Sequence, residues 1–371
     1  MTLNKLFLTN FRLHENTTLE FSNNLNYIVG GNGQGKTSIL EAIYYLCTTR
    51  NISQSSDQEA VTFSKKYFEL NGNFKDLTTN KTKVFYDNES NRKNYFLDDK
   101  QIYRASSIIG KFPVVTLTPS DHSITMGSPA DRRKFIDSVI SQSSDTYLKI
   151  LMEYNKTIKQ RSSLLSQLKD HRSAGLLQEL DAWDLMLAKN GAEIIRHRIN
   201  FLNDFELFVK EAYHNLMEEV EVPEIFYSTI QISDFSKIEE DILSALEKRR
   251  KDELIRGTNL VGPHRDDFVF SINGLELKKF GSQGQHKTFQ IALRFGQFFF
   301  MNERLGRKPI FLMDDVFGEL DTYRANKISE YLKDIGQAFI TMTDFSNVAN
   351  LSINETDRMI NVHGGVAEYV S

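Results

Sequence analysis

The chain has 371 residues, of which 40% are hydrophobic and 25% charged, and its formal net charge is −4. This composition is that of an ordinary globular protein with room for two or three domains. No apolar run approaches the ~18–20 residues of a membrane-spanning helix, and Met1–Asn10 is too short and polar for a signal peptide. The single Cys47 excludes an internal disulfide framework, so we expect a reducing, cytoplasmic setting.

Short apolar segments, separated by turns rich in Asn, Gly and Asp, fill the first part of the chain. Such segments are typical of β-strands. The expected strands are Leu3–Phe11, Leu19–Phe21, Leu25–Val29, Tyr67–Phe74, Lys83–Tyr86, Tyr95–Leu97 and Pro113–Leu117.

A glycine-rich loop follows the strand expected at Leu25–Val29 and opens into the helical pattern of Ser38–Leu46. It reads GGNGQGKT and fits the P-loop pattern G-x-x-x-x-G-K-T in its required strand–loop–helix context. The backbone N–H groups of such a loop bind phosphate oxygens, together with the N-terminus of the new helix. The expected nucleotide-binding residues are Gly30, Gly31, Asn32, Gly33, Gln34, Gly35, Lys36 and Thr37. Lys36 would reach the β- and γ-phosphates, and Thr37 would place its hydroxyl on Mg²⁺.

The middle of the chain changes to long helical patterns. Apolar residues recur at near-heptad spacing from Leu151 to Leu168 and again from Leu180 to Phe208, with the turn-like Lys169–Gly175 between them. Two long helices joined by a tight turn predict an antiparallel arm. We therefore expect an N-terminal head segment at 1–125, a helical arm at 126–222, and a C-terminal head segment at 223–371.

A second polar motif stands at the start of a later helix. Gly281–Lys287 reads GSQGQHK and immediately precedes the amphipathic pattern of Thr288–Glu303. Ser282, Gly284 and Gln285 resemble the signature motif of ABC-type ATPases, whose serine hydroxyl and helix-end amides bind the γ-phosphate held by a second subunit. The resemblance implies the same binding in trans here, and a simple helix N-cap is the alternative.

Two carboxylates end the apolar run Pro309–Met313. A continuous apolar run is typical of a strand buried on both faces, and its carboxyl end is where α/β sheets bind ligands. We expect Asp314 to hold Mg²⁺ and Asp315 to orient or deprotonate the attacking water, with Lys36 as the other catalytic residue. A buried strand that merely exits into an acidic turn is the alternative.

The order and spacing of these motifs indicate which class of ABC-type ATPase the chain resembles. Gly318–Asp321 (GELD) resembles the D-loop of ABC dimer interfaces, which would place Glu319 and Asp321 there. Gly281 lies 245 positions after Lys36, a longer separation than in transporter ATPases and similar to that in chromosome-maintenance and repair ATPases. The helical insert is too short for their very long coiled coils, and the sequence has no Cys-x-x-Cys for a zinc hook.

Four segments together resemble the RecF family of bacterial recombination and gap-repair ATPases along essentially the whole chain. They are Leu8–Arg12, the P-loop with Leu40–Ile43, Gly127–Asp137, and the hexapeptide Gly262–Asp267 (GPHRDD), which general ABC ATPases lack. The resemblance implies an α/β fold: an ABC/SMC-like P-loop ATPase head with an inserted helical arm domain. His264 and Arg265 of the hexapeptide are left with either a structural or a catalytic role.

The resemblance to RecF also implies a function. Members of that family form homodimers around two ATP molecules, clamp duplex DNA near single-strand gaps, and help RecR and RecO to load RecA. We accordingly expect ATP and Mg²⁺ as cofactors, DNA without sequence specificity and RecR/RecO-type mediators as partners, and a slow ATPase stimulated by DNA.

Departures from general ABC ATPases favour slow hydrolysis. Asp315 stands where most of them have a longer Glu, as is usual in RecF-like chains. The switch histidine expected after the next strand is absent from Phe339–Asp344, and no glutamine marks a switch loop around Thr118–Asp121. These differences bear on the rate of hydrolysis and leave ATP binding as expected.

Further cations are assigned by analogy or by clustering. Arg12 follows the first expected strand and, by analogy with related ATPases, would lie near the phosphates or base of the nucleotide. Because the net charge is negative, any DNA surface must be local. The candidate DNA-contact residues are Arg132, Arg133, Lys134, Lys248, Arg249, Arg250 and Lys251, and solvated surface charge is the alternative for each cluster.

Two other kinds of function fit the same residues. One is a nucleotide-switched adaptor whose ATP dimer mainly recruits proteins, with DNA contact secondary. In that case, neutralising Arg132, Arg133 and Lys134 would leave gap binding and its salt dependence unchanged. The other is a P-loop hydrolase or kinase that never uses Ser282. Substitution of Ser282 and DNA binding in different nucleotide states distinguish the three.

Overall fold

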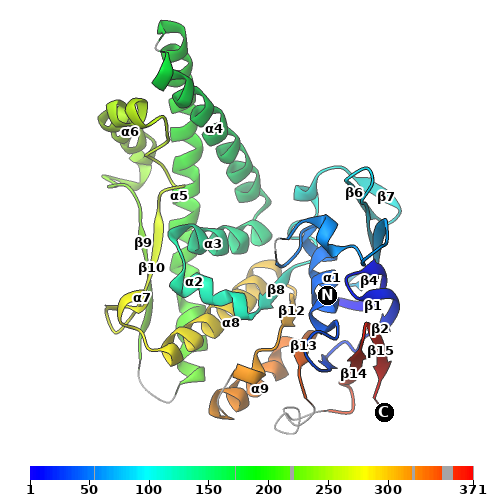
Figure 1. Cartoon of the computed structure of the whole chain (residues 1–371). Coiled ribbons are helices and arrows are strands. Elements are labelled where there is room, and N and C mark those ends of the chain that lie inside the picture. The colour runs from blue at the N-terminus through cyan, green and yellow to red at the C-terminus, as the bar shows by residue number, and fades with distance from the viewer. Residues whose placement is uncertain (54, 172, 218–220, 320–321, 345–353, 371) are drawn as a thin grey trace. The chain divides into compact units, whose positions relative to one another are not determined.

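The computed structural model describes residues 1–53, 55–171, 173–217, 221–319, 322–344 and 354–370 (Figure 1). The chain divides into two compact units. Unit 1 comprises Met1–Asp121, Asn215–Glu218 and Ile291–Ser371, and unit 2 comprises His122–His214 and Glu219–Gln290. Unit 1 thus contains both ends of the chain, as expected of the head. Residues 223–290, which we expected in the head, belong to unit 2 instead.

Unit 1 contains an antiparallel sheet of six strands in the order β2-β1-β4-β5-β6-β7. Its strands are β1 (Thr2–Phe11), β2 (His14–Glu20), β4 (Tyr67–Lys75), β5 (Thr79–Asp87), β6 (Arg92–Leu97) and β7 (Lys100–Ile102). Alternate side chains along β4, from Phe68 to Phe74, are buried while their neighbours are more exposed. This period of two is that of a sheet with one face on the core.

The second sheet of unit 1 has the order β15-β14-β3-β13-β12-β8 and is parallel except for its edge strand β15. Its strands are β3 (Leu25–Val29), β8 (Val114–Leu117), β12 (Ile310–Met313), β13 (Ala338–Met342), β14 (Arg358–His363) and β15 (Val366–Tyr369). All five residues of β3 are buried, as are those of β12 and β13. The expected apolar strands at 25–29 and 309–313 are confirmed.

Helix α1 (Lys36–Thr48) joins the two sheets of unit 1. It contacts β1 and β4 of the antiparallel sheet and β13 of the parallel sheet. Ile39, Ile43 and Leu46 are fully buried in one core that includes side chains from both sheets. Burial of such a helix stabilises the loop that precedes it, because the helix start cannot move without disturbing the core.

Unit 1 also contains a further helix and several 3₁₀ turns. They are α9 (Thr322–Ile335) and the 3₁₀ turns Asp57–Ala60, Ala105–Ser107, Pro119–Asp121 and Phe317–Glu319. Helix α8 (Gln283–Leu305) begins in unit 2 and ends in unit 1.

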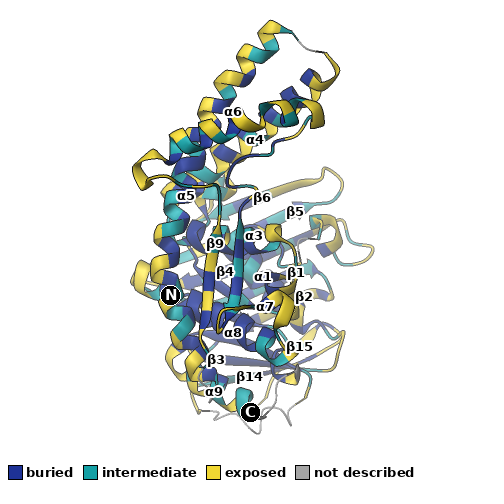
Figure 2. Cartoon of the chain, turned by 90° about the vertical axis from the view of Figure 1, so that its left-hand side faces the viewer, coloured by how far each residue is buried: buried dark blue, intermediate teal, exposed yellow. Residues whose placement is uncertain are grey.

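The described part of unit 2 contains both long and short helices. They are α2 (His122–Met126), α3 (Pro129–Ser143), α4 (Asp145–Asp170), α5 (Ala174–Leu216), α6 (Ile238–Arg256) and α7 (Leu277–Phe280), with a 3₁₀ turn at Phe235–Lys237. The expected helix pair is confirmed: α4 and α5 are long helices whose adjoining ends lie together (Figure 1). Buried and exposed positions alternate along both helices, as in amphipathic helices (Figure 2).

An antiparallel sheet in the order β11-β10-β9 completes unit 2. Its strands are β9 (Pro223–Ser228), β10 (Asp267–Ile272) and β11 (Leu275–Glu276). Strand β10 contacts α3 and α7. These pairings, and the contact of α6 with α4, explain why residues 223–290 group with the helices.

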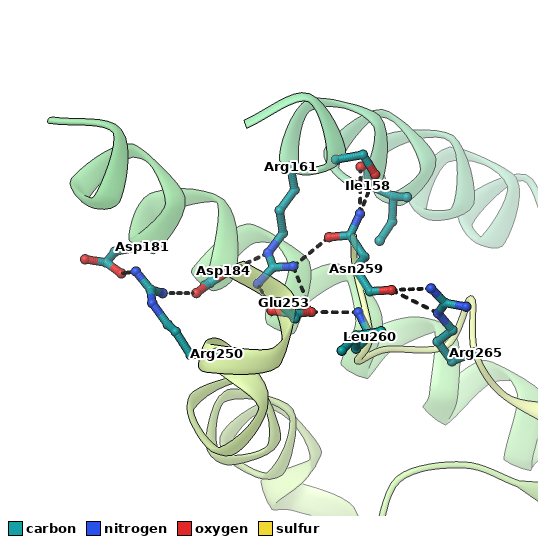
Figure 3. A network of polar contacts seen from close by, with 10 residues as sticks. Ile158, Arg161, Asp181, Asp184, Arg250, Glu253, Asn259, Leu260 and Arg265 are labelled. Atoms are coloured by element: carbon teal, nitrogen blue, oxygen red, sulfur yellow. Dashed lines mark hydrogen bonds and ion pairs between the residues drawn. The ribbon is translucent and has the colours of Figure 1, made fainter. Parts of the chain in front are cut away.

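A buried arginine connects three segments of unit 2 (Figure 3). Arg161 on α4 is fully buried and donates from Nε to Asp184 of α5 at 2.6 Å. Its terminal nitrogens contact both carboxylate oxygens of Glu253 on α6, at 3.1 and 2.6 Å, and the side-chain oxygen of Asn259 at 2.6 Å. All five N–H groups of an arginine are donors, so the planar group suits several acceptors at once.

The acceptors of Arg161 are themselves bonded to neighbouring groups. Glu253 also accepts from the backbone N–H of Leu260 at 2.7 Å, and Asn259 donates to the carbonyl of Ile158 at 3.1 Å (Figure 3). Asp184 also accepts a hydrogen bond from a second arginine, Arg250, at 2.7 Å. The buried charges are thus paired and hydrogen-bonded, which is the condition for burying them at tolerable cost.

Candidate nucleotide-binding site

The P-loop of unit 1 runs from the end of β3 to the start of α1. The backbone N–H of Gly30 donates to the carbonyl of Met342 on β13 at 3.1 Å, which anchors the loop to the parallel sheet. Gly35 has a φ of 106°, a conformation that favours glycine, and α1 begins at the next residue. The loop therefore ends at a helix N-terminus, and Gly35 stands where the backbone needs a positive φ.

Lys36 lies folded over this loop. Its Nζ donates to the carbonyls of Gly30 at 2.6 Å and Gly31 at 2.9 Å, and the residue is 6% exposed. Burial lowers the pKa of Lys36, while Asp315 and Asp314 act in the opposite direction. An ammonium held by carbonyls across the loop is placed to exchange them for phosphate oxygens.

Asp314 and Thr37 meet at the carboxyl end of the parallel sheet. The Thr37 hydroxyl donates to the Asp314 carboxylate at 2.9 and 3.2 Å. The Asp314 backbone N–H donates to the carbonyl of Leu117 on β8 at 2.9 Å, which fixes the strand end. These are the hydroxyl and the carboxylate that we expected, from the sequence, to hold Mg²⁺.

The oxygens at this point fit a hard cation that brings other ligands with it. Mg²⁺ commonly binds through one or two protein oxygens together with phosphate oxygens and water. Within the part of the chain that the structure describes, no group of three or more His, Cys, Asp or Glu side chains could hold a metal by itself. The donor set therefore suits Mg²⁺ that arrives with a nucleotide.

Thr341 is a site residue that sequence reasoning missed. It is fully buried on β13, donates to Asp314 Oδ1 at 2.8 Å and accepts from the backbone N–H of Asp315 at 2.8 Å. Asp315 itself has a φ of 48°, a left-handed conformation that Asp tolerates. One hydroxyl thus orients both carboxylate residues, and the polar residue in an otherwise apolar strand was the signal in the sequence.

Arg12 contacts the helix that follows the P-loop. Its guanidinium contacts both oxygens of Glu41 on α1, at 2.9 and 3.3 Å. It also donates to the carbonyl of Glu59 at 2.9 Å and to the hydroxyl of Ser55 at 3.1 Å. Arg12 is therefore tied to α1, five residues beyond Lys36, and its contact with a nucleotide remains a prediction.

The signature-like segment lies in unit 2 and caps α8. The backbone N–H of Ser282 donates to Gln285 Oε1 at 2.8 Å, and the backbone N–H of Gln285 donates to Ser282 Oγ at 3.2 Å. This reciprocal pair is a capping box, so the N-cap interpretation holds for the single chain. Ser282 is nevertheless exposed, and its helix N-terminus can still accept phosphate from another molecule.

The D-loop assignment concerns Glu319 and Asp321. Asp321 lies outside the described residues, and of Glu319 only the backbone, in the turn Phe317–Glu319, is described. The assignment of both residues stays a prediction.

Three of the candidate DNA-contact arginines are bonded within the protein. Arg132 is 5% exposed and forms a two-pronged ion pair with Asp267, at 2.7 and 2.8 Å. Arg133 donates to the backbone carbonyl of Asp266, and burial lowers its pKa. Arg250 pairs with Asp184 in the network of Figure 3. These contacts favour structural roles for the three arginines, and their assignment to DNA contact stays a prediction.

The other four cations of these clusters have exposed side chains. Lys134 lies on α3, and Lys248, Arg249 and Lys251 lie within one turn of each other on α6. Arg249 pairs with Asp252 at 3.0 Å on the surface, an arrangement of little energetic weight. The group on α6 is therefore accessible to a polyanion.

The hexapeptide Gly262–Asp267 lies in unit 2, where its residues contact separate elements. The carbonyl of Pro263 accepts from Arg198 of α5 at 2.8 Å, and His264 Nδ1 lies 2.7 Å from the Tyr154 hydroxyl of α4. Arg265 donates to the carbonyl of Asn259 at 3.0 Å. Of the two roles left open for His264 and Arg265, these contacts favour the structural one.

Burial shifts the pKa values of His264 and Asp266 in this segment in opposite directions. Burial lowers the pKa of His264 to about 4, helped by the charge of Arg265. Burial raises the pKa of Asp266 to about 6, although Arg198 opposes it. Folding therefore disfavours a proton on His264 between pH ~6.5 and ~4 and favours one on Asp266 between pH ~6 and ~4.

Replacing His264 with glutamine should change how the free energy of unfolding depends on pH. In the wild type, acidification from pH ~6.5 to ~4 lowers the free energy of unfolding through His264, and Asp266 offsets part of the loss. The stability of H264Q relative to wild type should therefore rise as the pH falls, by on the order of 1.4 kcal/mol per pH unit at most. Urea unfolding across this range measures the difference. His214→Gln, at an exposed position of α5, is the control for replacing a histidine elsewhere in the unit. A pH-independent difference for H264Q would contradict the prediction.

The P-loop and the carboxylates at a strand end, on a mainly parallel sheet, are those of an ABC/SMC-like P-loop ATPase head, here with an inserted helical unit. The RecF/RecN/SMC N-terminal domain family matches residues 2–367. A DNA replication and repair protein RecF from Chloroherpeton thalassium is 41% identical over 359 residues, covering 95% of this chain and 97% of that protein. The chain belongs to the RecF family.

A further relative and two solved structures are also similar to this chain. A DNA replication and repair protein RecF from Cytophaga hutchinsonii is 36% identical over 376 residues, covering 99% of this chain and 97% of that protein. A solved structure of the recombination mediator protein RecF-ATP in the RecFOR pathway has a TM-score of 0.89 at 30% identity, covering 100% of this chain and 97% of that one. The Smc head domain of Pyrococcus furiosus shares the fold, with a TM-score of 0.57 at 15% identity, covering 99% of this chain and 95% of that one.

The structure also bears on the expectation about membranes. Among the described residues, none of the helices combines the length and the apolar character needed to cross a bilayer.

Proposed function

We propose that this chain is an ATP-dependent DNA-binding protein that acts in DNA replication and recombinational gap repair. The observation that carries the proposal is the contact between Thr37 and Asp314 beside Lys36, which assembles the elements of a Mg²⁺–ATP site. The relatives named DNA replication and repair protein RecF supply the support for the DNA-related role.

Nucleotide chemistry at the site follows from its side chains. Lys36 binds the β- and γ-phosphates, and Thr37 and Asp314 hold Mg²⁺, which neutralises phosphate charge when bound. Asp315 orients the attacking water. Its short side chain and the absence of a switch histidine in the sequence 339–344 favour slow hydrolysis that serves to reset the protein.

ATP acts in this proposal by joining two copies of the chain. Ser282, Gly284 and Gln285 of one copy bind the γ-phosphate held by the P-loop of the other, with Glu319 and Asp321 at the same interface. Because ADP lacks the γ-phosphate, it gives the closed dimer no such bond. ATP is therefore the ligand that discriminates between the closed and open states.

DNA contact is assigned to the exposed cations of unit 2. Lys248, Arg249 and Lys251 on α6, together with Lys134 on α3, bind phosphates without reading the base sequence. Mediator proteins of the RecR/RecO type then help RecA to load at the gap. The RecFOR pathway named for the solved relative supports this choice of partners.

Fluorescence anisotropy on gapped duplex DNA tests the proposal. Binding should be at least ~10-fold tighter with ATP than with ADP or without nucleotide, because ATP stabilises the closed dimer. Ser282→Arg should keep ATP affinity but lose both the ATP-dependent dimer and the gain in DNA affinity. The matched control is Ser163→Arg, which adds the same charge at an exposed position of α4. Equal DNA binding in all three nucleotide states would contradict the clamp and favour the adaptor.

The same assay tests the assignment on α6. Replacing Lys248, Arg249 and Lys251 together with glutamine should reduce the slope of log affinity against log salt by about 0.9 for each phosphate that the variant no longer neutralises. Lys156→Gln with Lys159→Gln, exposed on α4, is the control. An unchanged slope in the triple variant would remove α6 from the DNA surface.

A further inference from the structure

The P-loop is packed from behind by residues far from it in sequence. A Cβ added to Gly30 would lie 2.2 Å from the carbonyl oxygen of Val362 on β14. A Cβ added to Gly35 would lie 2.9 Å from Nε2 of His14 on β2. The back of the loop is therefore closed by two strands that carry none of the nucleotide-binding residues.

His14 bonds directly to the P-loop backbone. The residue is fully buried, with Nε2 3.0 Å from the carbonyl oxygen of Gly35 and Nδ1 3.0 Å from the Thr17 hydroxyl. A carbonyl only accepts, so Nε2 must carry the proton in this contact. Burial lowers the pKa of His14, which favours the neutral ring with its proton on Nε2. Nδ1 is then an acceptor for the Thr17 hydroxyl.

The turn between β14 and β15 bonds to the same stretch of loop. The backbone N–H of Gly364 donates to Gln34 Oε1 at 2.6 Å, and that of Gly365 donates to the Gln34 carbonyl at 3.0 Å. Both glycines have positive φ, at 55° and 80°. A Cβ on Gly365 would lie 2.2 Å from the carbonyl oxygen of Leu13, so only glycine allows this approach.

Thr17 joins the two supports. Its hydroxyl lies 3.0 Å from His14 Nδ1 and 3.1 Å from the carbonyl oxygen of Gly365. The hydroxyl has one proton, so it donates either to Nδ1 or to the Gly365 carbonyl at any one time. In either case His14 bonds directly to Gly35 and the turn bonds directly to Gln34, so the loop is held from both sides. All of these residues belong to unit 1.

We infer that His14 and the Gly364–Gly365 turn form a clasp that holds Gln34 and Gly35 of the P-loop in the phosphate-binding conformation before ATP arrives. The clasp acts through the loop and touches no nucleotide, so His14 and the turn are positioning residues. Because a preformed loop loses less conformational freedom on binding, the clasp strengthens ATP affinity. The inference rests on the proposed ATP binding.

Two substitutions of similar size separate bonding from packing at His14. His14→Leu fills the space without a donor, and His14→Gln retains an N–H that can reach the Gly35 carbonyl. Isothermal titration with Mg²⁺–ATP should show about tenfold weaker binding for H14L, equivalent to about one missing hydrogen bond. H14Q should stay within about threefold of the wild type. Hydrogen exchange at the Gly364 and Gly365 amides, measured without nucleotide, should be faster in H14L.

The turn supplies an independent variant with a matched control. Gly365→Ala should push the turn off Leu13 and weaken ATP binding to a similar extent as H14L. His363→Ala changes an exposed residue of the same hairpin and should bind ATP as the wild type does. Wild-type affinity in H14L and G365A would overturn the clasp. So would equal losses of affinity and of melting temperature in H14L and H14Q, which would indicate ordinary core packing.

The outcomes also separate the clasp from the proposed function. If the wild type binds no Mg²⁺–ATP, the proposed function fails. The exchange rates at Gly364 and Gly365 still decide whether His14 holds the loop. If the wild type binds ATP and neither affinity nor exchange responds to H14L, the clasp alone fails.

Discussion

Replacing Arg161 with methionine is expected to lower the free energy of unfolding by about 3–5 kcal/mol, the usual cost of breaking a buried ion pair by removing one partner. Methionine keeps most of the volume and contacts of the arginine stem, so the loss reports the charge and its hydrogen bonds. Glu253 is 1% exposed, and among the described residues the backbone N–H of Leu260 would be the one hydrogen-bond donor left to its carboxylate. An uncompensated charge in such a place is what makes the substitution costly.

The only tryptophan of the chain gives a local readout of this effect. Trp183 packs against the cluster of Leu164, Leu165, Leu168 and Leu180, beside Asp184. Its fluorescence during urea unfolding should shift to lower urea in R161M. Combining R161M with Glu253→Gln, which removes the unpaired charge, should restore part of the loss.

A surface arginine of the same unit serves as the control for Arg161. Arg249 pairs with Asp252 at 3.0 Å, with both side chains about half exposed, so R249M should cost less than about 0.5 kcal/mol. A loss in R161M no greater than that in R249M would show that the network of Figure 3 contributes little.

Replacing Lys36 with methionine is expected to weaken Mg²⁺–ATP binding by about 100-fold, since charge-assisted hydrogen bonds are worth about 1.5–3 kcal/mol. The reason lies in the position of Nζ, which two loop carbonyls hold over the P-loop. The fold should survive: burial lowers the pKa of Lys36, so removing the buried ammonium relieves a cost. Isothermal titration measures affinity, and the melting temperature without nucleotide measures stability.

The control for Lys36 is Lys83→Met, which removes a half-exposed lysine paired with Glu69 on the antiparallel sheet of the same unit. It should bind ATP normally. Retained affinity in K36M would mean that the P-loop does not bind the phosphates of ATP as proposed. That result would remove the basis of the clamp as well.

Local patterns predicted the nucleotide loop, its flanking strand and helix, and the strand that ends in Asp314. Each of these depends on residues adjacent in sequence: glycines at a turn, a run of apolar residues, or an amphipathic repeat. The long helices α4 and α5 were predicted on the same basis. The residues that support the site, Thr341 and His14, were not predicted, because neither belongs to a sequence motif.

The roles of the charge clusters could not be predicted from local sequence patterns. Arg132 and Arg250 read as surface cations, yet their carboxylate partners lie 135 and 66 positions away in the sequence. A run of like charges gives no information on which remote carboxylates it will meet after folding. The same applies to residues 223–290, whose strand and helix patterns fit either unit until β9 pairs with β10 and α6 packs on α4.

The sequence by itself determined that this chain has a P-loop, a carboxylate strand end and the marks of the RecF family, because those features are short and local. Only the tertiary structure decided that Thr37 meets Asp314, 277 positions away, and that His14 and the Gly364–Gly365 turn support the loop from behind. It also decided which arginines are buried in ion pairs. The physical reason is that strand order and helix packing bring distant residues within bonding distance, and nothing in the neighbouring sequence specifies those partners.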